Sequence, residues 1–529
     1  MRNYLLKDGG YMSKFLKIVI PLLLLTGCYN PPVILKPFPT PAPVVLPSPI
    51  IPTPIATIAP TPVPTIAPTV APTVAPTIMP VPTIVPTVAP TSAPISAGSG
   101  ITISANGFVN SIGINSHFSY GNTIYRDNAP LVVDAILGLH IMHMREGMLI
   151  PFNRQFDSYQ YAINRLSTAG VRNIGGVQAY DLMAPDFATR WSNWFDSVGG
   201  LNWVEGTEPP NECDLNDCLN NVPDYQKILY GVIKNYAPSS SISVLGPSLV
   251  KFSSYNQSGD LSAYMDNGNG HFYTLSQPPE TSGSCKASDE CAGGDSTGGN
   301  IGNTFSLEAL VKGDAVTSGT KPIINTETGY CTTVTDQGTS YNDIPEDVQA
   351  DYWPRYLLHA YGDLNIPRTF IYDIADDGLS APTFDKCGLI DNQGRQKPSY
   401  KILKSMLDAV NDPGPTYTPV PLNYAIGAPK NVDGNDVKSM AVGLRNGSYA
   451  IFIWNPVSRW YQQSGNGGNK SHYLYPATIP ASLVILNSFD TATVTTYDSS
   501  TGQATTISAD PNQAININTT TTITMILLK

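Results

Sequence analysis

Between residues 101 and 412, short apolar and β-branched runs alternate with longer stretches whose apolar residues recur at helical spacing. Short apolar runs bounded by turn residues indicate strands, and apolar residues three and four positions apart indicate helices with one buried face. Amphipathic stretches cover residues 131–137, 156–166, 225–233, 348–358 and 400–410. Eight candidate strands begin near Ser111, Ile141, Val171, Leu201, Ile242, Gly270, Pro322 and Arg368. This rhythm predicts βαβ units that form a (β/α)8 TIM barrel.

Beyond Pro413 the helical spacing is replaced by alternation without helices. Turn pairs such as Asp433-Gly434 and Asn446-Gly447 separate these runs, as in antiparallel hairpins. The alternating runs cover residues 438–444, 448–454, 482–486, 492–497 and 520–528. We therefore expect a smaller all-β sandwich over residues 413–529, packed on the barrel.

The N-terminus has the order of a secretory signal over residues 1–28. Lys14 and Lys17 precede the apolar run 18–25, which is too short to cross a bilayer. The segment then ends in Leu-Thr-Gly-Cys28, which resembles the lipobox of bacterial lipoproteins. The resemblance implies lipid attachment at Cys28 and a location on the bacterial cell envelope, at the outer membrane or the cell surface. An ordinary cleaved signal is the alternative.

Residues 29–100 form a linker dominated by Pro, Thr and Ala, in which Lys36 is the only charged residue. Such a composition cannot bury a core, and dense proline favours extended polyproline II at about 3.1 Å per residue. We expect a disordered, semi-rigid stalk that holds the folded part away from the membrane.

Charge and composition indicate the class of partner. The net charge of −11 and the charged fraction of 13% disfavour nucleic acid, which requires clustered Lys and Arg. The 28 Tyr, 15 Phe and 6 Trp provide flat faces on which neutral sugar rings can stack. We expect a glycan partner and a monomeric protein.

Six cysteines remain when Cys28 is set aside, and an even number in an exported protein favours disulfides. Their connectivity does not follow from the sequence. We favour the pairs Cys213 with Cys218, Cys285 with Cys291, and Cys331 with Cys387, because each would staple loops expected on one face of the barrel.

Candidate catalytic carboxylates lie at two strand ends. The fourth candidate strand leads into Glu208 and the segment Pro209-Pro210-Asn211-Glu212, and the seventh ends at Glu327. In a barrel the reacting groups sit at the C-terminal ends of the strands, and ends four and seven face each other across the mouth. Hydrolysis of a glycoside with retention needs two carboxyl groups about 5 to 5.5 Å apart.

Residues 107–412 resemble clan A of the glycoside hydrolases, the 4/7 barrels. The match rests on the order of several segments: 113–120 (GINSHFSY), 145–147 (REG), 245–249 (LGPSL), 321–330 (KPIINTETGY), 372–377 (YDIADD), 388–391 (GLID) and 397–400 (KPSY). The resemblance implies a retaining enzyme that cleaves a β-linked polysaccharide or oligosaccharide. Glu327 would be its nucleophile, and Arg145 would hydrogen-bond that carboxylate.

The acid/base is less clearly marked, because Thr207 stands where the clan usually has Asn before the glutamate. We favour Glu208 on strand-end geometry, with Glu212 as the alternative, since Asn211-Glu212 keeps the Asn-Glu order but needs a bulged loop. Either Thr207 or Asn211 would then contact the sugar 2-hydroxyl.

Four further residues are candidates for the sugar pocket. His271 and Tyr273, on the sixth strand, match the clan's His and Tyr beside the nucleophile, and the Tyr273 hydroxyl would orient Glu327. His117 ends the first strand, and Tyr372 ends the eighth. A packed core histidine is the alternative for both histidines.

Other chemistries lack their motifs: the sequence has no HExxH, no CxxC pair, no Walker loop and no GxGxxG after a strand, so we expect no cofactor and no metal. A serine hydrolase would need a GxSxG elbow, and Ser248 follows Gly-Pro rather than sitting in one. A non-catalytic carbohydrate-binding or adhesion lipoprotein on a degenerate barrel is the second hypothesis.

Overall fold

The computed structural model describes residues 101–148, 157–250, 252–274, 276–280, 307–332, 344–378, 386–463 and 470–529. The predicted lipid attachment site Cys28, the signal segment and the linker lie outside these residues. Among the described helices, none is long and apolar enough to cross a bilayer.

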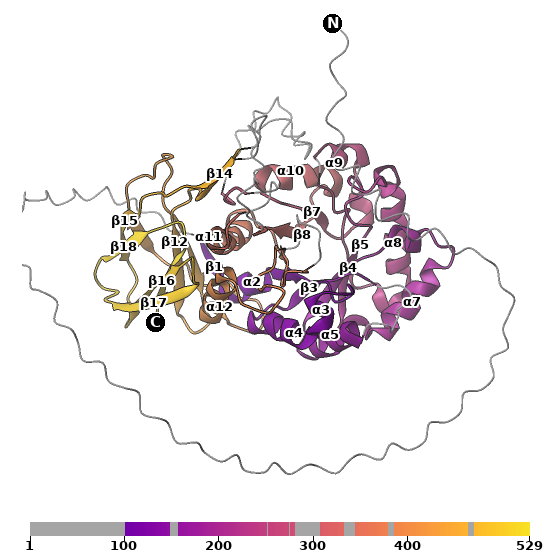
Figure 1. The fold of residues 1–529 in the computed structure, drawn as a ribbon, viewed down its shortest axis with the longest axis horizontal. Helices are drawn as coiled ribbons and strands as arrows, with labels where there is room; N and C mark the ends of the chain where they lie inside the picture. Colours follow the sequence, from indigo (N-terminus) through magenta and orange to yellow (C-terminus); the bar gives the residue numbers. More distant parts are fainter. Residues whose placement is uncertain are drawn as a thin grey trace, which may run out of the picture. The chain divides into compact units, whose positions relative to one another are not determined.

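Eight parallel strands form the first sheet, in the order β6-β5-β4-β3-β2-β9-β8-β7 (Figure 1). Isolated parallel bridges from Leu245 to Asn267 and from Leu249 to Gly270 connect the two outer strands and close the barrel. The strands are β2 (Ile112–Asn115), β3 (His143–Arg145), β4 (Arg172–Gly176), β5 (Val204–Glu208), β6 (Ser243–Val244), β7 (Gly268–His271), β8 (Ile323–Gly329) and β9 (Thr369–Tyr372).

Helices follow the strands around the barrel, since each parallel strand pair needs a crossover. They are α2 (Ala105–Asn110), α3 (Ile124–Asp127), α4 (Ala129–Gly138), α5 (Asp157–Thr168), α6 (Ala179–Leu182), α7 (Phe187–Ser197), α8 (Val222–Asn235), α9 (Phe252–Ser258), α10 (Leu307–Ser318), α11 (Glu346–Leu358) and α12 (Pro398–Val410). The five amphipathic stretches predicted from the sequence fall within α4, α5, α8, α11 and α12, apart from residue 156, which is outside the described residues.

Three barrel strands start two or three residues from their predicted positions. The second begins at His143 rather than Ile141. The fourth barrel strand begins at Val204 rather than Leu201, because Gly199 and Gly200 adopt positive φ angles of 97° and 57° and start a 3-10 turn over Gly200–Asn202. The sixth strand begins at Gly268, two residues before the predicted Gly270. Glycine-rich starts carry little apolar signal, so the pattern does not mark them.

The barrel interior is layered. Near the N-terminal ends of the strands, Glu205 accepts hydrogen bonds from His143 and Arg368, at 2.7 Å and 3.2 Å. An apolar layer follows, made by Ile174, Leu245, Ile324 and Phe370. Above it lies a polar layer that leads into the barrel mouth.

The C-terminal residues form two antiparallel sheets and a hairpin (Figure 1). The six-stranded sheet has the order β1-β11-β12-β19-β16-β17, and its first strand, β1 (Thr102–Ser104), precedes the barrel in the chain. The other strands are β10 (Tyr424–Gly427), β11 (Lys438–Gly443), β12 (Tyr449–Trp454), β13 (Trp460–Gln463), β14 (Lys470–Tyr473), β15 (Ile479–Ile485), β16 (Ala492–Asp498), β17 (Gln503–Ala509), β18 (Ile515–Thr519) and β19 (Thr524–Leu528). The predicted fold class, a TIM barrel followed by a smaller β-sandwich, is confirmed.

Strand β12 explains why its sequence is a continuous apolar run. Ile451 and Ile453 pack in the core between the two sheets, whereas Phe452 and Trp454 pack with the barrel core. Because successive side chains of a strand point to opposite faces, a strand buried on both sides must be apolar throughout.

Helix α11 joins the barrel to the sandwich through three charged residues spaced four apart. Asp347 and Asp351 each accept a hydrogen bond of 2.8 Å from Arg459 of the sandwich. Arg355 is fully buried, pairs with Glu280 at 2.5 Å and donates to the carbonyl of Val457 at 3.2 Å. Residues four apart share one helix face, so this face docks the sandwich.

Two of the three favoured cysteine pairs form disulfides, Cys213–Cys218 and Cys331–Cys387. The first lies within the loop after β5, and the second joins the segments that follow β8 and β9. The third pair, Cys285 with Cys291, lies outside the described residues.

Replacing Glu280 with Ala leaves the Arg355 guanidinium buried without its carboxylate, so we expect the free energy of unfolding to fall by about 3 to 5 kcal/mol. The matched control is Glu346→Ala on α11, the helix that carries Arg355. This change removes an exposed ion pair with Arg395. That loss should be about 0 to 1 kcal/mol. Unfolding in guanidinium chloride measures both, and equal losses would show that the buried pair does not hold the sandwich to the barrel.

Candidate active site

Arg145 occupies the centre of the polar layer at the barrel mouth. It ends β3, and the alternation of that strand points His143 and Arg145 to the same side, into the barrel. Its guanidinium donates to Glu208 at 2.6 Å, to Glu327 at 2.8 Å and to Asn211 at 2.7 Å. One cation therefore connects residues from barrel strands four and seven.

Glu208 lies inside the barrel, with a fully buried side chain. One carboxylate oxygen accepts from Arg145, and the other accepts from the Asn269 amide at 2.6 Å. The side-chain carbonyl of Asn269 in turn accepts a hydrogen bond from the Thr326 hydroxyl at 2.7 Å. Both oxygens of Glu208 are thus used within the interior network.

Glu212 lies in the loop after β5, where the backbone bulges outward and Glu212 adopts a φ of 45°. Its amide donates to the Ser248 carbonyl at 3.1 Å, and the Cys213–Cys218 disulfide closes the following turn. The His271 ring nitrogen Nδ1 lies 2.7 Å from its carboxylate. The loop therefore returns Asn211 and Glu212 to the barrel mouth.

Glu327 points into the mouth from β8. The register of β8 against β9 shifts between Asn325 and Thr328. Such an irregularity lets consecutive residues point to one side, as Thr326 and Glu327 do here. The Tyr273 hydroxyl donates to one oxygen of Glu327 at 2.6 Å, and Arg145 donates to the other.

Electrostatics keep Glu327 ionised. Burial opposes its charge, but the positive charges of His271 and Arg145 and the Tyr273 hydrogen bond outweigh burial and lower the pKa of Glu327. Burial likewise opposes charge on His271, while Glu327 and Glu212 raise the pKa of this imidazole. The His271 ring therefore lies between the side chains of Glu212 and Glu327.

The two glutamates at the surface of the mouth are close together. One oxygen of Glu212, one oxygen of Glu327 and a ring nitrogen of His271 all lie within 4.8 Å of one another. The side chains of Glu212 and Glu327 are 19% and 12% exposed, so both can meet a ligand from solvent.

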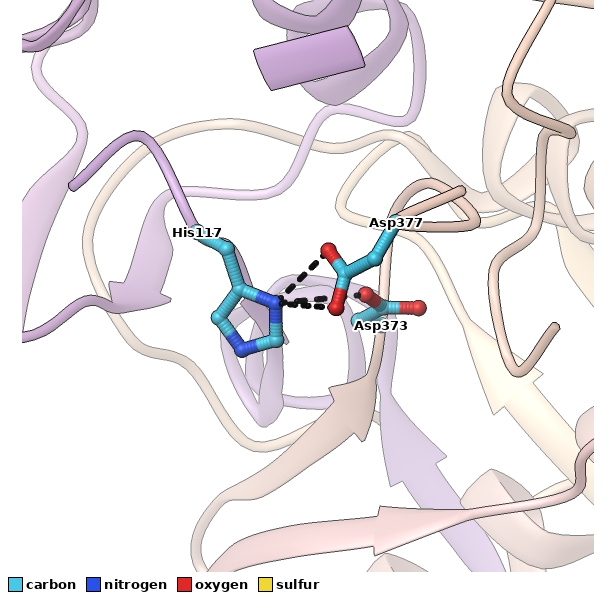
Figure 2. A group of neighbouring side chains, drawn as sticks. All are labelled: His117, Asp373 and Asp377. Atoms are coloured by element: carbon cyan, nitrogen blue, oxygen red, sulfur yellow. Dashed lines mark hydrogen bonds and ion pairs between the residues drawn. The ribbon is translucent and has the colours of Figure 1, made fainter. Parts of the chain in front are cut away.

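His117 is held in a second cluster at the same mouth, shown in Figure 2. Its Nδ1 lies 3.0 Å from the Asp377 carboxylate and 3.8 Å from that of Asp373. Burial opposes the charge, but the bond to Asp377 and the two aspartates raise the pKa of His117 to about 9. Tyr372, half-buried at the end of β9, packs edge-on against the His117 ring at 5.4 Å.

Both clusters have ligand types that could hold a metal ion, namely Glu212 with His271 and Glu327, and His117 with the two aspartates. In each cluster the neighbouring carboxylates raise the pKa of the histidine, so a metal ion bound there would compete with protonation of the ring.

Four residues that organise this mouth were not predicted from the sequence: Asn269, Glu146, Asp377 and Tyr120. Glu146 accepts hydrogen bonds from Ser116, Phe118 and Ser119 and so fixes the loop after β2. Glu146, Asp377 and Tyr120 all lie in segments that carried the family resemblance, 145–147, 372–377 and 113–120. Asn269 precedes the predicted start of its strand, which is why it was overlooked.

Comparison with known proteins gives a match of fold only. No family model matches the chain, and no curated protein does. Among solved structures, a family 39 glycoside hydrolase from the gut symbiont Bacteroides cellulosilyticus has a TM-score of 0.52 at 14% identity, over 81% of this chain and 82% of that one. A glucosidase from Croceicoccus marinus has a TM-score of 0.51 at 10% identity, over 83% and 99%. The chain therefore has a glycosidase-like fold, a (β/α)8 barrel with a β-sandwich.

Proposed function

We propose that the protein is a glycoside hydrolase that cleaves β-glycosidic bonds with retention of configuration. The observation that carries the proposal is the approach of Glu212 and Glu327, partly exposed at the barrel mouth, to within 4.8 Å between carboxylate oxygens. Double displacement needs carboxyl groups about 5 to 5.5 Å apart, whereas inversion needs about 6.5 to 9.5 Å to admit a water. The order of the clan A-like segments supports the same reaction.

We assign the nucleophile to Glu327 and the acid/base to Glu212, rather than to Glu208, which strand-end geometry favoured. A proton donor must reach the glycosidic oxygen of a substrate that enters from solvent. Glu208 is fully buried, and both its oxygens are bonded to Arg145 and Asn269. Glu212 is partly exposed and lies beside the nucleophile.

The reaction follows from these positions. Glu327 attacks the anomeric carbon while Glu212 protonates the departing oxygen, which breaks the glycosidic bond and forms a glycosyl ester on Glu327. Glu212, now a carboxylate, is stabilised by the His271 ring at 2.7 Å. It then takes a proton from water, whose oxygen attacks the anomeric carbon and releases Glu327 and the sugar.

Binding and location complete the proposal. Asn211, held by Arg145 at 2.7 Å, is placed to contact the sugar 2-hydroxyl, and His117 and Tyr372 line the same mouth. Lipid attachment at Cys28 and an envelope location remain proposals from the sequence.

Glu327→Ala in the full chain should reduce kcat on a β-glycan panel by roughly four or more orders of magnitude, because the attacking group is lost. Proton NMR of the wild-type reaction should show the β-anomer of the product first. An initial α-anomer would refute retention. Glycan binding without turnover by the wild type would favour the non-catalytic binding lipoprotein.

Glu212→Gln and Glu208→Gln separate the two candidates for acid/base. Loss of the proton donor should cost roughly 100- to 10,000-fold on substrates with poor leaving groups and far less on activated aryl glycosides. Glu208→Gln removes the buried partner of Arg145 and should lower the rates on poor and on activated leaving groups by a similar factor. The measurement is kcat/KM over a series of leaving groups, and leaving-group dependence in Glu208→Gln instead would reverse the assignment.

Tyr273→Phe should shift the acidic limb of the profile of kcat/KM against pH to higher pH. Glu327 must be ionised to attack, and its pKa is lowered partly by the Tyr273 hydrogen bond, so loss of the hydroxyl raises that pKa. A hydrogen bond to a charged group corresponds to a shift of about one pH unit. Tyr475→Phe, on the sandwich, is the control. A limb that does not move would show that Tyr273 does not act on Glu327.

A further inference from the structure

Tyr120 is a large side chain at the barrel mouth that remains substantially exposed. It lies in the loop after β2, and 46% of its surface is accessible. Loops that follow barrel strands form the face where ligands bind. An exposed aromatic ring beside a candidate catalytic centre needs an explanation of its own, because neither the nucleophile nor the acid/base uses it.

The loop that carries Tyr120 is fixed in place. Glu146 accepts hydrogen bonds of 2.8 Å from the Ser116 hydroxyl, 2.7 Å from the Phe118 amide and 2.7 Å from the Ser119 hydroxyl. The Tyr120 amide donates to the His117 carbonyl at 2.8 Å. A ring on such a loop is ordered before a ligand arrives, which lowers the entropy cost of binding.

The ring itself rests on His117. The two ring planes are nearly parallel, at 7°, and their centroids are 4.3 Å apart. Asp377 fixes the imidazole from the side, at 3.0 Å, as Figure 2 shows. Because His117 covers one face of Tyr120, the exposed area belongs to the opposite face and the edge of the ring.

Tyr120 lies near the candidate nucleophile. His117, beneath it, packs against Tyr372 at 5.4 Å, and Tyr372 pairs with Gly329, two residues after Glu327. Partial burial and the negative charges of Glu146, Asp377 and Glu327 raise the pKa of Tyr120 to about 12, which keeps the hydroxyl neutral. The ring thus lies at the same barrel mouth as Glu327 and within reach of its charge.

The charges nearby limit the chemistry of the occupant. The carboxylates of Glu146, Asp377 and Glu327 and the guanidinium of Arg145 all act on Tyr120, and the His117 ring beneath it has a pKa of about 9. Three negative charges thus face two positive ones, and the excess of negative charge disfavours an acidic sugar at this position. A neutral pyranose offers an apolar face of C–H groups that can cover an aromatic ring. We propose that the exposed face of Tyr120 is a stacking platform for a neutral sugar ring of the substrate, next to the cleaved bond. This inference rests on the proposed function.

Binding, rather than turnover, tests the platform. Full-length Glu327→Gln serves as the parent, and calorimetry measures its Kd for neutral gluco-, xylo- and manno-oligosaccharides and for glucuronate-bearing analogues. In this parent, Tyr120→Ala should weaken binding of the preferred neutral oligosaccharide about tenfold, the equivalent of losing one aromatic contact. Tyr120→Phe keeps the face and should change Kd by less than about twofold.

Tyr475→Ala, which removes an 82% exposed tyrosine of the sandwich, is the matched control and should leave Kd unchanged. Equal binding by Tyr120→Ala and the parent would overturn the platform. So would tighter binding of the glucuronate analogues, or no binding of any neutral oligosaccharide. Thermal unfolding checks that each variant is folded. Since no step requires hydrolysis, failure here leaves the proposed reaction standing, and failure of hydrolysis leaves this result standing.

Discussion

The ion pairs of Arg145 are the constraint on which the barrel mouth depends. A guanidinium at the top of the barrel interior must be matched by negative charge, and Glu208 and Glu327 supply it from strands four and seven. Once Arg145 is held between these two glutamates, its remaining NH2 group donates to the side-chain oxygen of Asn211. This bond brings the loop that carries Glu212 back over the barrel. The position of Glu212, the proposed acid/base, thus follows from a cation two strands away.

Burial separates carboxylates that look alike in the sequence. Glu208 and Glu212 are four residues apart, both near the end of one strand, yet one is enclosed by Arg145 and Asn269 and the other borders solvent. Glu146 is likewise enclosed, whereas Glu327 is partly exposed. The enclosed carboxylates hold cations and loops, and the partly exposed ones are available to a ligand.

The fold could be predicted from the sequence because periodicity is a local property. Eight short apolar runs and the helical stretches between them predicted the barrel, and runs that alternate without helices predicted the sandwich. The residue types of the centre, Glu327, Arg145, His271 and Tyr273, also followed from strand ends and family resemblance. The partner of Glu208 did not, since Asn269 lies 61 residues away in a strand whose glycines weaken the pattern. Nor did the partner of His117, which is 260 residues distant.

The choice between Glu208 and Glu212 could be made only from the three-dimensional structure. A strand-end rule assumes that the chain leaves the barrel directly after the strand. Here two prolines and a residue with positive φ redirect it, and the disulfide after Glu212 closes the turn. The residue farther from the strand end in sequence is therefore the one that borders solvent beside Glu327. A bulged loop is therefore compatible with the Asn-Glu order of the clan, and the altered spacing is no sign in itself of a degenerate site.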